Sequence, residues 1–199
     1  MRRTIALFLL LLQAVAVMGG TPGSPEDPAR DFARAAQKPL LSSQGPARTP
    51  LADHGQKATV LIFLAHDCPV TNATAPALAR LASEFTPRGV HFFGIYTTET
   101  AAEINTHCRD YGLTFPGLLD PKLHLARLAG ATRMPEAAVF SPAGKLLYRG
   151  RIDDRAIQPG RTRPTPSRQD LRLALESILS GQPPDPRFTP AIGCYLPAH

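Results

Sequence analysis

A cysteine at the junction of two predicted elements is the residue best placed to do chemistry in this chain. Cys68 directly follows the apolar run at 59–65 and precedes a stretch with helical spacing at 70–85. Unpaired backbone N–H groups and the positive end of a helix dipole stabilise a thiolate there, and they lower the pKa of a thiol from about 8.5 to about 3.5–7.5. The thiolate is the reactive form of cysteine, so this position predicts a redox nucleophile.

The residue before this cysteine opposes that effect. The carboxylate of Asp67 disfavours a second negative charge beside it by about 1 kcal/mol, which is similar to the contribution of one helix terminus. Residue order alone does not rank the two contributions. The degree to which Cys68 is activated therefore stays open at this point.

The chain has 3 cysteines, which are too few for a disulfide scaffold. Cys194 lies in a Pro-rich tail, TPAIGCYL, where it could resolve an oxidised Cys68, dock without reacting, or pair between chains. Cys108 lies on the apolar stripe of a predicted helix at 99–111. That position favours a buried and inert thiol.

Metal-ligating residue types occur side by side in two places. His66, Asp67 and Cys68 adjoin, and His107 is next to Cys108. Neighbours in sequence point apart on strands and helices, and no ligand spacing such as CxxC or HxxxH accompanies them. We therefore expect no metal site, and we expect no cofactor.

Composition and charge exclude several classes of protein. The hydrophobic fraction of 43% and the charged fraction of 19% are typical of a soluble globular chain rather than a disordered or multi-pass membrane protein. Seven arginines lie in the segment 149–172, which could be read as a nucleic-acid patch. The segment has no interleaved aromatic residues and no known nucleic-acid-binding motif, so it is better interpreted as a solvated Pro-rich loop. We therefore expect no nucleic-acid partner.

Hydrophobic spacing predicts strands that alternate with helices. Strands are expected at 59–65, 90–97, 115–119, 136–140 and 145–151, and helices at 70–85, 99–111, 122–129 and around 171–178. The alternation predicts a mostly parallel sheet, and the final hairpin adds an antiparallel edge. The fold class is therefore α/β.

The two ends of the chain differ in composition from the middle. Residues 1–20 carry two arginines, a short apolar run and then small residues, which is typical of a secretory signal peptide that is removed on export. Residues 21–50 and 181–199 are rich in proline and are expected to be extended or loosely docked arms. We therefore expect a periplasmic or secreted protein that is not inserted in a membrane after cleavage.

The surroundings of Cys68 resemble a known superfamily. Pro69 follows the cysteine, Pro76 lies eight residues after it, and Pro135 stands directly before the predicted hairpin. The string GRIDD follows the second hairpin strand, at 150–154. In these features the chain resembles the thioredoxin-like superfamily, and within it the exported thiol-disulfide oxidoreductases and the redoxin group, which is of AhpC/TSA type and related to the peroxiredoxins.

The resemblance implies a thioredoxin-like fold over a domain at 51–180, in which a central mixed sheet is flanked by helices and carries an inserted strand and helix. It implies that Pro135 is a cis-proline that faces Cys68 and shapes the substrate groove. Thr71 would hydrogen-bond the thiolate. The residues expected to contact the substrate are His66, Pro69, Arg133 and Met134.

The chain departs from the patterns of the superfamily at several positions. Thr71 stands where dithiol members have a second cysteine, so Cys68 would act as a single attacking thiol. Ala65 replaces the Thr or Ser of peroxiredoxins, and Pro135 replaces their arginine, with Arg133 only nearby. Thiol exchange is therefore favoured over efficient peroxidase activity. In the related copper-delivering group, a second cysteine stands where this chain has Asn72. The resemblance therefore does not imply a copper site.

We therefore expect an exported thiol redox protein that acts through Cys68 on protein disulfides or thiols or on hydroperoxides, with an unidentified thiol as its reductant. One alternative is a peroxidase of peroxiredoxin type in which Cys194 is the resolving cysteine, since the resembling subgroup tends to carry a Gly-Cys pair near its C-terminus. Another alternative is a non-catalytic module that binds an extended peptide near Pro135.

Overall fold

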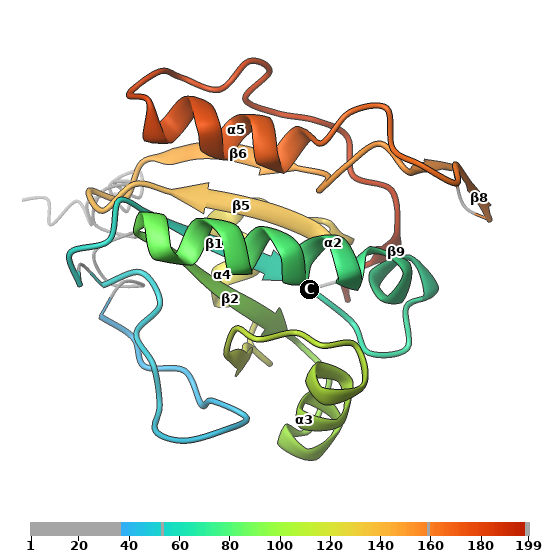
Figure 1. Cartoon of the computed structure of the whole chain (residues 1–199). Helices are drawn as coiled ribbons and strands as arrows, with labels where there is room; N and C mark the ends of the chain where they lie inside the picture. Colours follow the sequence, from blue (N-terminus) through green and yellow to red (C-terminus); the bar gives the residue numbers. More distant parts are fainter. Residues whose placement is uncertain (1–36, 53, 159, 198–199) are drawn as a thin grey trace, which may run out of the picture.

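A five-stranded sheet forms the centre of the chain, as the computed structural model shows for residues 37–52, 54–158 and 160–197 (Figure 1). The elements, in chain order, are β1 (Ala58–Phe63), α2 (Pro69–Phe85), a 3₁₀ turn η1 (Thr86–Arg88), β2 (Val90–Tyr96), α3 (Ala101–Asp110), β3 (Gly117–Leu119), α4 (His124–Ala129), β4 (Arg133–Met134), β5 (Glu136–Phe140), β6 (Leu146–Gly150), β7 (Ala156–Gln158), β8 (Arg161–Thr162), α5 (Asp170–Leu179) and β9 (Cys194–Tyr195).

The sheet has the strand order β3-β2-β1-β5-β6. Strand β1 pairs with β2 in parallel and with β5 antiparallel, so Val60 lies between Phe92 and Val139. All six residues of β1 are buried, as expected for an apolar run covered on both faces. The central mixed sheet flanked by helices is confirmed, and its carboxyl edge is where β1 leads into α2.

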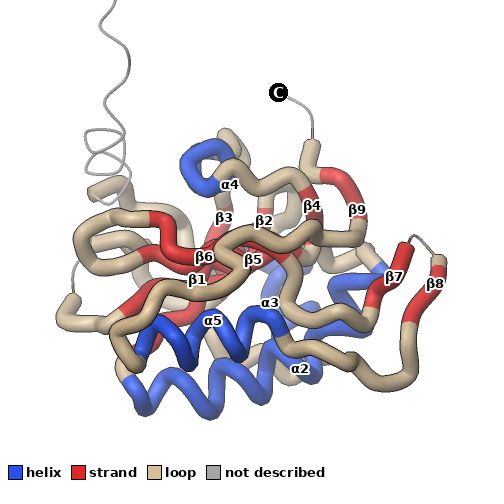
Figure 2. Tube along the Cα trace, turned by 90° about the horizontal axis from the view of Figure 1, so that it is seen from above, coloured by secondary structure: helices blue, strands red, loops and turns tan. Residues whose placement is uncertain are grey.

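Helices cover both faces of the sheet (Figure 2). On one face α2, α3 and α5 enclose an apolar cluster that includes Leu78, Ile104 and Leu175. On the other face α4 packs against a second cluster, which contains Leu61, Phe63 and Cys68. The cysteine therefore belongs to the apolar interior on the α4 side.

The long elements lie where hydrophobic spacing predicts them, and the hairpin strand at 136–140 has the expected bounds. Four strands of two or three residues were not predicted: β4 pairs with β9, and β7 pairs with β8. The segment between the predicted strand at 145–151 and the last helix, interpreted as a solvated Pro-rich loop, therefore also contains the short strands β7 and β8. Backbone hydrogen bonds and side-chain ion pairs order parts of this segment without an apolar period.

Both terminal arms contact the domain where the structure describes them. Leu40 is buried, Ser42 forms an antiparallel bridge with Leu118 of β3, and Arg149 of β6 forms a parallel bridge with Phe188 of the tail. The expected signal peptide at 1–20 lies outside the described residues. Within the described ranges, none of the helices combines the length and the apolarity needed to cross a membrane.

Candidate redox site

The amino end of α2 presents Cys68 at the edge of the sheet. Cys68 is the N-cap residue in an extended conformation (φ −83°, ψ 115°), and Pro69 occupies the first helical turn. Proline is suited to this position because its missing N–H would have no partner there. The Cys68 carbonyl accepts the first helical bond from the Asn72 amide at 3.0 Å. The Cys68 side chain is 1% exposed, so it sits beside the helix terminus in a dry environment.

Cys68 forms a disulfide with Cys194, which is 126 residues away in sequence. The Cα atoms of the two residues are 6.3 Å apart, within the usual range for a disulfide. From the sequence, Cys194 could resolve Cys68, dock without reacting, or pair between chains. The structure brings the two thiols together within one chain, and Cys108 is the free cysteine.

A short backbone pairing holds the tail at this disulfide. Strands β4 and β9 are antiparallel, with Met134 opposite Cys194 and Arg133 opposite Tyr195. The Met134 carbonyl oxygen lies 3.3 Å from Cys68 Sγ, and the peptide bond from Met134 to Pro135 is cis. The expected groove proline therefore lies next to both cysteines.

A hydroxyl next to the disulfide has no partner. Thr71 is fully buried in the first turn of α2, and its Oγ1 atom makes no hydrogen bond with any described residue in this disulfide-bonded form. A disulfide sulfur carries no charge to attract it. The hydrogen bond from Thr71 to a Cys68 thiolate stays a prediction about the reduced form.

A chain of buried and half-buried polar groups supports the loop before Cys68. Tyr96 Oη lies 2.7 Å from His107 Nδ1, His107 Nε2 lies 3.0 Å from Asn72 Oδ1, and Asn72 Nδ2 donates to the His66 carbonyl at 3.1 Å. An amide oxygen only accepts, so His107 Nε2 carries the hydrogen and Nδ1 accepts from Tyr96. Burial lowers the pKa of His107, which favours this neutral tautomer.

The third cysteine is buried, as predicted. Cys108 is buried, its sulfur lies 3.9 Å from Tyr96 Oη, and burial raises the pKa of its thiol. The same burial raises the pKa of the Tyr96 hydroxyl. Both groups therefore stay protonated at neutral pH and supply no competing nucleophile.

An open groove of about 610 Å³ runs beside the disulfide. Pro69 and Arg133, two of the expected substrate-contacting residues, line it together with Cys194 and Tyr195. Arg133 also stacks on the Tyr195 ring at 3.4 Å. Met134 is buried and pairs with the tail instead.

The fourth expected contact residue, His66, lies next to Glu99. Its Nδ1 atom is 3.5 Å from Glu99 Oε1, and its side chain is 40% exposed. With Asp67 these two side chains form a group whose ligand atoms lie within 4.8 Å of one another and could hold a metal ion. Glu99 already accepts backbone N–H bonds from His66 and Thr98, so its carboxylate has protein partners.

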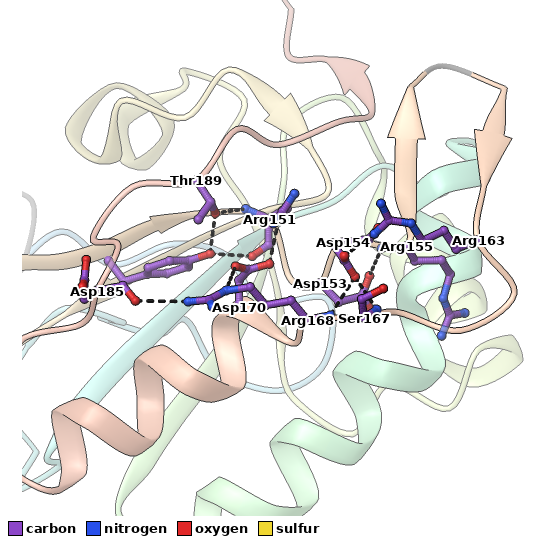
Figure 3. Close-up of polar contacts among 11 residues, drawn as sticks. Arg151, Asp153, Asp154, Arg155, Arg163, Ser167, Arg168, Asp170, Asp185 and Thr189 are labelled. Carbon is purple, nitrogen blue, oxygen red and sulfur yellow. Dashed lines mark hydrogen bonds and ion pairs between the residues drawn. The ribbon is translucent and has the colours of Figure 1, made fainter.

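The GRIDD segment anchors the tail that carries Cys194 (Figure 3). Thr189 Oγ1 accepts from the Arg151 amide at 3.1 Å and lies 2.7 Å from Tyr148 Oη. Arg151 pairs at 2.7 Å with the buried carboxylate of Asp170, which also binds Arg168. Arg151 belongs to the GRIDD string noted in the sequence, whereas Tyr148, Arg168, Asp170 and Thr189 were not singled out there.

A cysteine at a strand–helix junction, next to an X-Pro bond before a hairpin on a mixed sheet, is the arrangement of the thioredoxin-like fold. The profile of the AhpC/TSA family matches residues 25–149, which is more than half of the chain. The chain therefore belongs to the AhpC/TSA family. A search among curated proteins found no match.

Solved structures share this fold. An uncharacterized conserved protein from Geobacillus kaustophilus is 26% identical, with a TM-score of 0.70 over 81% of this chain and 89% of that chain. A secreted disulfide oxidoreductase of Mycobacterium tuberculosis is 20% identical, with a TM-score of 0.52 over 74% and 98%. The bacterioferritin comigratory protein of Xanthomonas campestris, described for its alkyl peroxide reduction activity, is 21% identical, with a TM-score of 0.51 over 59% and 80%.

Proposed function

We propose that this protein is an exported thiol redox enzyme in which Cys68 is the nucleophile and Cys194 is the resolving cysteine. The observation that carries the proposal is the disulfide between these residues, which joins the amino end of α2 to a tail strand held by backbone pairing. Secretion of the Mycobacterium tuberculosis neighbour supports the proposal of export, together with the signal-like composition of residues 1–20.

The reaction requires two exchanges. In the reduced enzyme the Cys68 thiolate attacks one sulfur of a substrate disulfide, which breaks that bond and releases a substrate thiolate. The Cys194 thiolate then attacks Cys68 of the mixed disulfide, closes the internal bond and releases the second substrate thiolate. The substrate disulfide is reduced to two thiols, and the enzyme is oxidised by the same two electrons.

The site supports disulfides as the main substrate class. Strand β4 pairs with an extended segment of the tail, and the adjoining groove is lined largely by apolar side chains, so the site already accommodates a peptide next to a sulfur. Ala65 and Pro135 stand where peroxiredoxins have the groups that activate peroxide, and neither side chain supplies a hydrogen-bond donor.

Hydroperoxide reduction is the second candidate, and the burial of Cys68 favours it. Cys68 is 1% exposed, so while the tail is docked a small oxidant reaches it more easily than a protein disulfide does. The thiolate would attack the peroxide oxygen, giving a sulfenic acid and an alcohol or water. Condensation with the Cys194 thiol would then release water and form the same disulfide.

Trapping of the intermediate tests the main proposal. Reduced Cys194→Ser protein, treated with an aromatic disulfide such as 5,5′-dithiobis(2-nitrobenzoate), should retain one thionitrobenzoate on Cys68. The Cys108→Ser control should instead release two thionitrobenzoates and close the internal disulfide. Intact-mass and peptide spectra distinguish these products. An unlabelled Cys68 in Cys194→Ser protein would overturn the proposal and favour a non-catalytic peptide-binding module.

The two oxidants can be compared in the same preparation. The second-order rate constant for closure of the Cys68–Cys194 bond should be at least tenfold larger with a peptide disulfide than with hydrogen peroxide. A larger constant for peroxide would make the second candidate the main activity.

A further inference from the structure

The groove at the disulfide and a second cavity lie along one face of α2. Val70 and Ala73 line the part beside Cys194, while Ala77 and Arg80 line a second cavity of about 380 Å³. Residues at this spacing lie on one side of a helix. A small hollow of about 20 Å³, lined by Val70, Ala156, Ile152 and others, lies between the two, because it shares lining residues with each cavity.

The distance between the two ends follows from the helix. Ala77 and Arg80 lie seven and ten residues after Val70, so at 1.5 Å per residue the second cavity is about 10–15 Å along α2 from Val70, which lines the groove beside Cys194. An extended chain covers that distance in three or four residues.

The charged residues that line the second cavity are mostly arginines. Arg80, Arg155 and Arg172 line the second cavity, with Asp153 as the acidic residue among the described residues around it. Arg172 is engaged, since its guanidinium binds both carboxylate oxygens of Glu84. Asp153 accepts the backbone N–H of Arg155 at 3.0 Å.

Two of these arginines have N–H groups that could bind a ligand. Arg155 reaches the Ala73 carbonyl through Nη1 at 3.2 Å, but its Nε atom is buried without a hydrogen-bond partner among the described residues. Arg80 is exposed and lies in the lining of the cavity. Guanidinium groups bind carboxylates in a two-pronged geometry, so this cavity suits a carboxylate.

The oxidation state of the protein indicates which molecule must enter. The groove is open while the disulfide is closed, and Cys194 lines it, whereas Cys68 is 1% exposed. The partner required by a closed disulfide is a reducing thiol. On the basis of the function proposed above, we propose that the electron donor binds along this groove and carries a carboxylate about 10–15 Å from its sulfur.

The donor would reduce the protein in two thiol–disulfide exchanges. The donor thiolate attacks Cys194 Sγ, the bond to Cys68 breaks, and its electron pair leaves on the Cys68 sulfur at the amino end of α2. A second donor thiol attacks the mixed disulfide and releases the Cys194 thiolate. The donor thiols are oxidised to a disulfide, and their two protons end on Cys68 and Cys194 or in solvent.

Synthetic thiols test this assignment. The probes are acetylated, amidated nonapeptides with a central Cys flanked on each side by three Ala residues, with Asp at both ends in one and Asn at both ends in the other. Two acidic ends allow either orientation in the groove. The rate constant for reduction of the oxidised protein is measured by acid quenching, alkylation and mass analysis, and is divided by each thiol's rate with a small-molecule disulfide.

At low ionic strength the Asp peptide should reduce the protein five- to twentyfold faster than the Asn peptide. This ratio should approach 1 in the double variant Arg80→Gln/Arg155→Gln and at 0.5 M salt. The control variant Arg109→Gln removes the charge of an exposed side chain on α3, and it should keep the wild-type ratio. A wild-type ratio near 1, or a ratio that the double variant leaves unchanged, would overturn the assignment.

Failure of the underlying function gives a different result. If neither dithiothreitol nor either peptide changes the oxidation state of Cys68 and Cys194 in the wild-type protein, the proposed redox function is wrong. If dithiothreitol reduces the disulfide and the two peptides reduce it with equal rate constants, the proposed function is retained and the carboxylate site is wrong.

Discussion

Thr71 illustrates how one side chain can act differently in the two oxidation states of Cys68. In the disulfide form its hydroxyl is buried and has no hydrogen-bond partner among the residues that the structure describes, which costs about 1–3 kcal/mol. In the reduced form a Cys68 thiolate would accept that hydroxyl hydrogen. The residue would therefore favour the reduced state over the oxidised state.

Thr71→Val should consequently act in opposite directions on the two forms. In a Cys108→Ser/Cys194→Ser background we expect the apparent pKa of Cys68 alkylation to rise by about 1 unit, because a hydrogen bond to a charged group contributes about 1.5–3 kcal/mol. The oxidised Thr71→Val protein should be about 1 kcal/mol more stable in denaturant. Thr74→Val is the control, since the Thr74 hydroxyl donates to the Val70 carbonyl. Equal pKa values in both variants would contradict the role of Thr71.

His107 makes the stability of the protein depend on pH. Burial, followed by the nearby His66, lowers the pKa of His107 below its usual 6.5. An unfolded chain binds this proton more readily than the folded one, so the free energy of unfolding should fall as the pH drops below about 6.5. Denaturant titrations from pH 8 to pH 5 should show a shallower decrease in His107→Gln than in wild type. Parallel curves would rule out His107 as the source.

Some site residues were predictable from short strings, and others were not. Cys68 and Pro135 stand out because the features that mark them, a strand–helix junction and a proline before a hairpin, are local. The partner of Cys68 was not decidable, because Cys194 is 126 residues away and a single Gly-Cys pair has several uses. Thr189 carries no signal of its own, since its role depends on a contact with Arg151.

At the scale of elements, the strand pair β4–β9 brings the tail to the site. Its close approach depends on Gly193, where a Cβ atom would lie 2.0 Å from the Met134 carbonyl oxygen and 2.7 Å from the carbonyl carbon. Both of these atoms belong to the backbone, so the neighbour cannot simply rotate away. The strands must separate to accept any larger residue.

Gly193→Ala should therefore weaken the tail docking and leave the domain folded. We expect closure of the Cys68–Cys194 bond by a fixed disulfide reagent to slow at least tenfold, with a thermal midpoint for the reduced protein within about 2 °C of wild type. Pro190→Ala, at an exposed tail position, is the control. An unchanged closure rate in Gly193→Ala would show that the pairing is not needed for resolution.

Length decided which elements could be predicted. Strands β1 and β2 and helix α2 have six, seven and 17 residues, enough for an apolar run or a helical period to show. Strands β4, β8 and β9 have two residues each, and two residues contain no period. Such strands are defined by their partners, so no local pattern could identify them.

At the scale of the whole molecule, the disulfide and the GRIDD contacts turn a Pro-rich tail into part of the domain. The expectation of an extended or loosely docked tail rested on composition alone. The structure adds what composition does not contain: main-chain bonds of Arg149 with Arg187 and Thr189, and a further bond from Leu196 to Thr132.

Reduction should therefore lower the stability of the whole protein. The disulfide spans 126 residues, and constraint of a loop of this size in the unfolded chain contributes about 3–5 kcal/mol. Denaturant unfolding of the oxidised and reduced protein should show a gap of that size, and Cys108→Ser should keep it. A gap below about 1 kcal/mol would mean that the tail bond does not constrain the unfolded chain as argued.

The most direct test of the account is a map of all three thiols through one redox cycle. The reduced protein is treated with one equivalent of oxidised peptide, then with dithiothreitol, and each stage is alkylated, digested and analysed by mass spectrometry. We expect a linked Cys68–Cys194 peptide that appears on oxidation and disappears on reduction, with Cys108 unchanged throughout. A Cys68 that is oxidised while Cys194 stays free to alkylate would contradict the central claim that these two residues form the working redox pair.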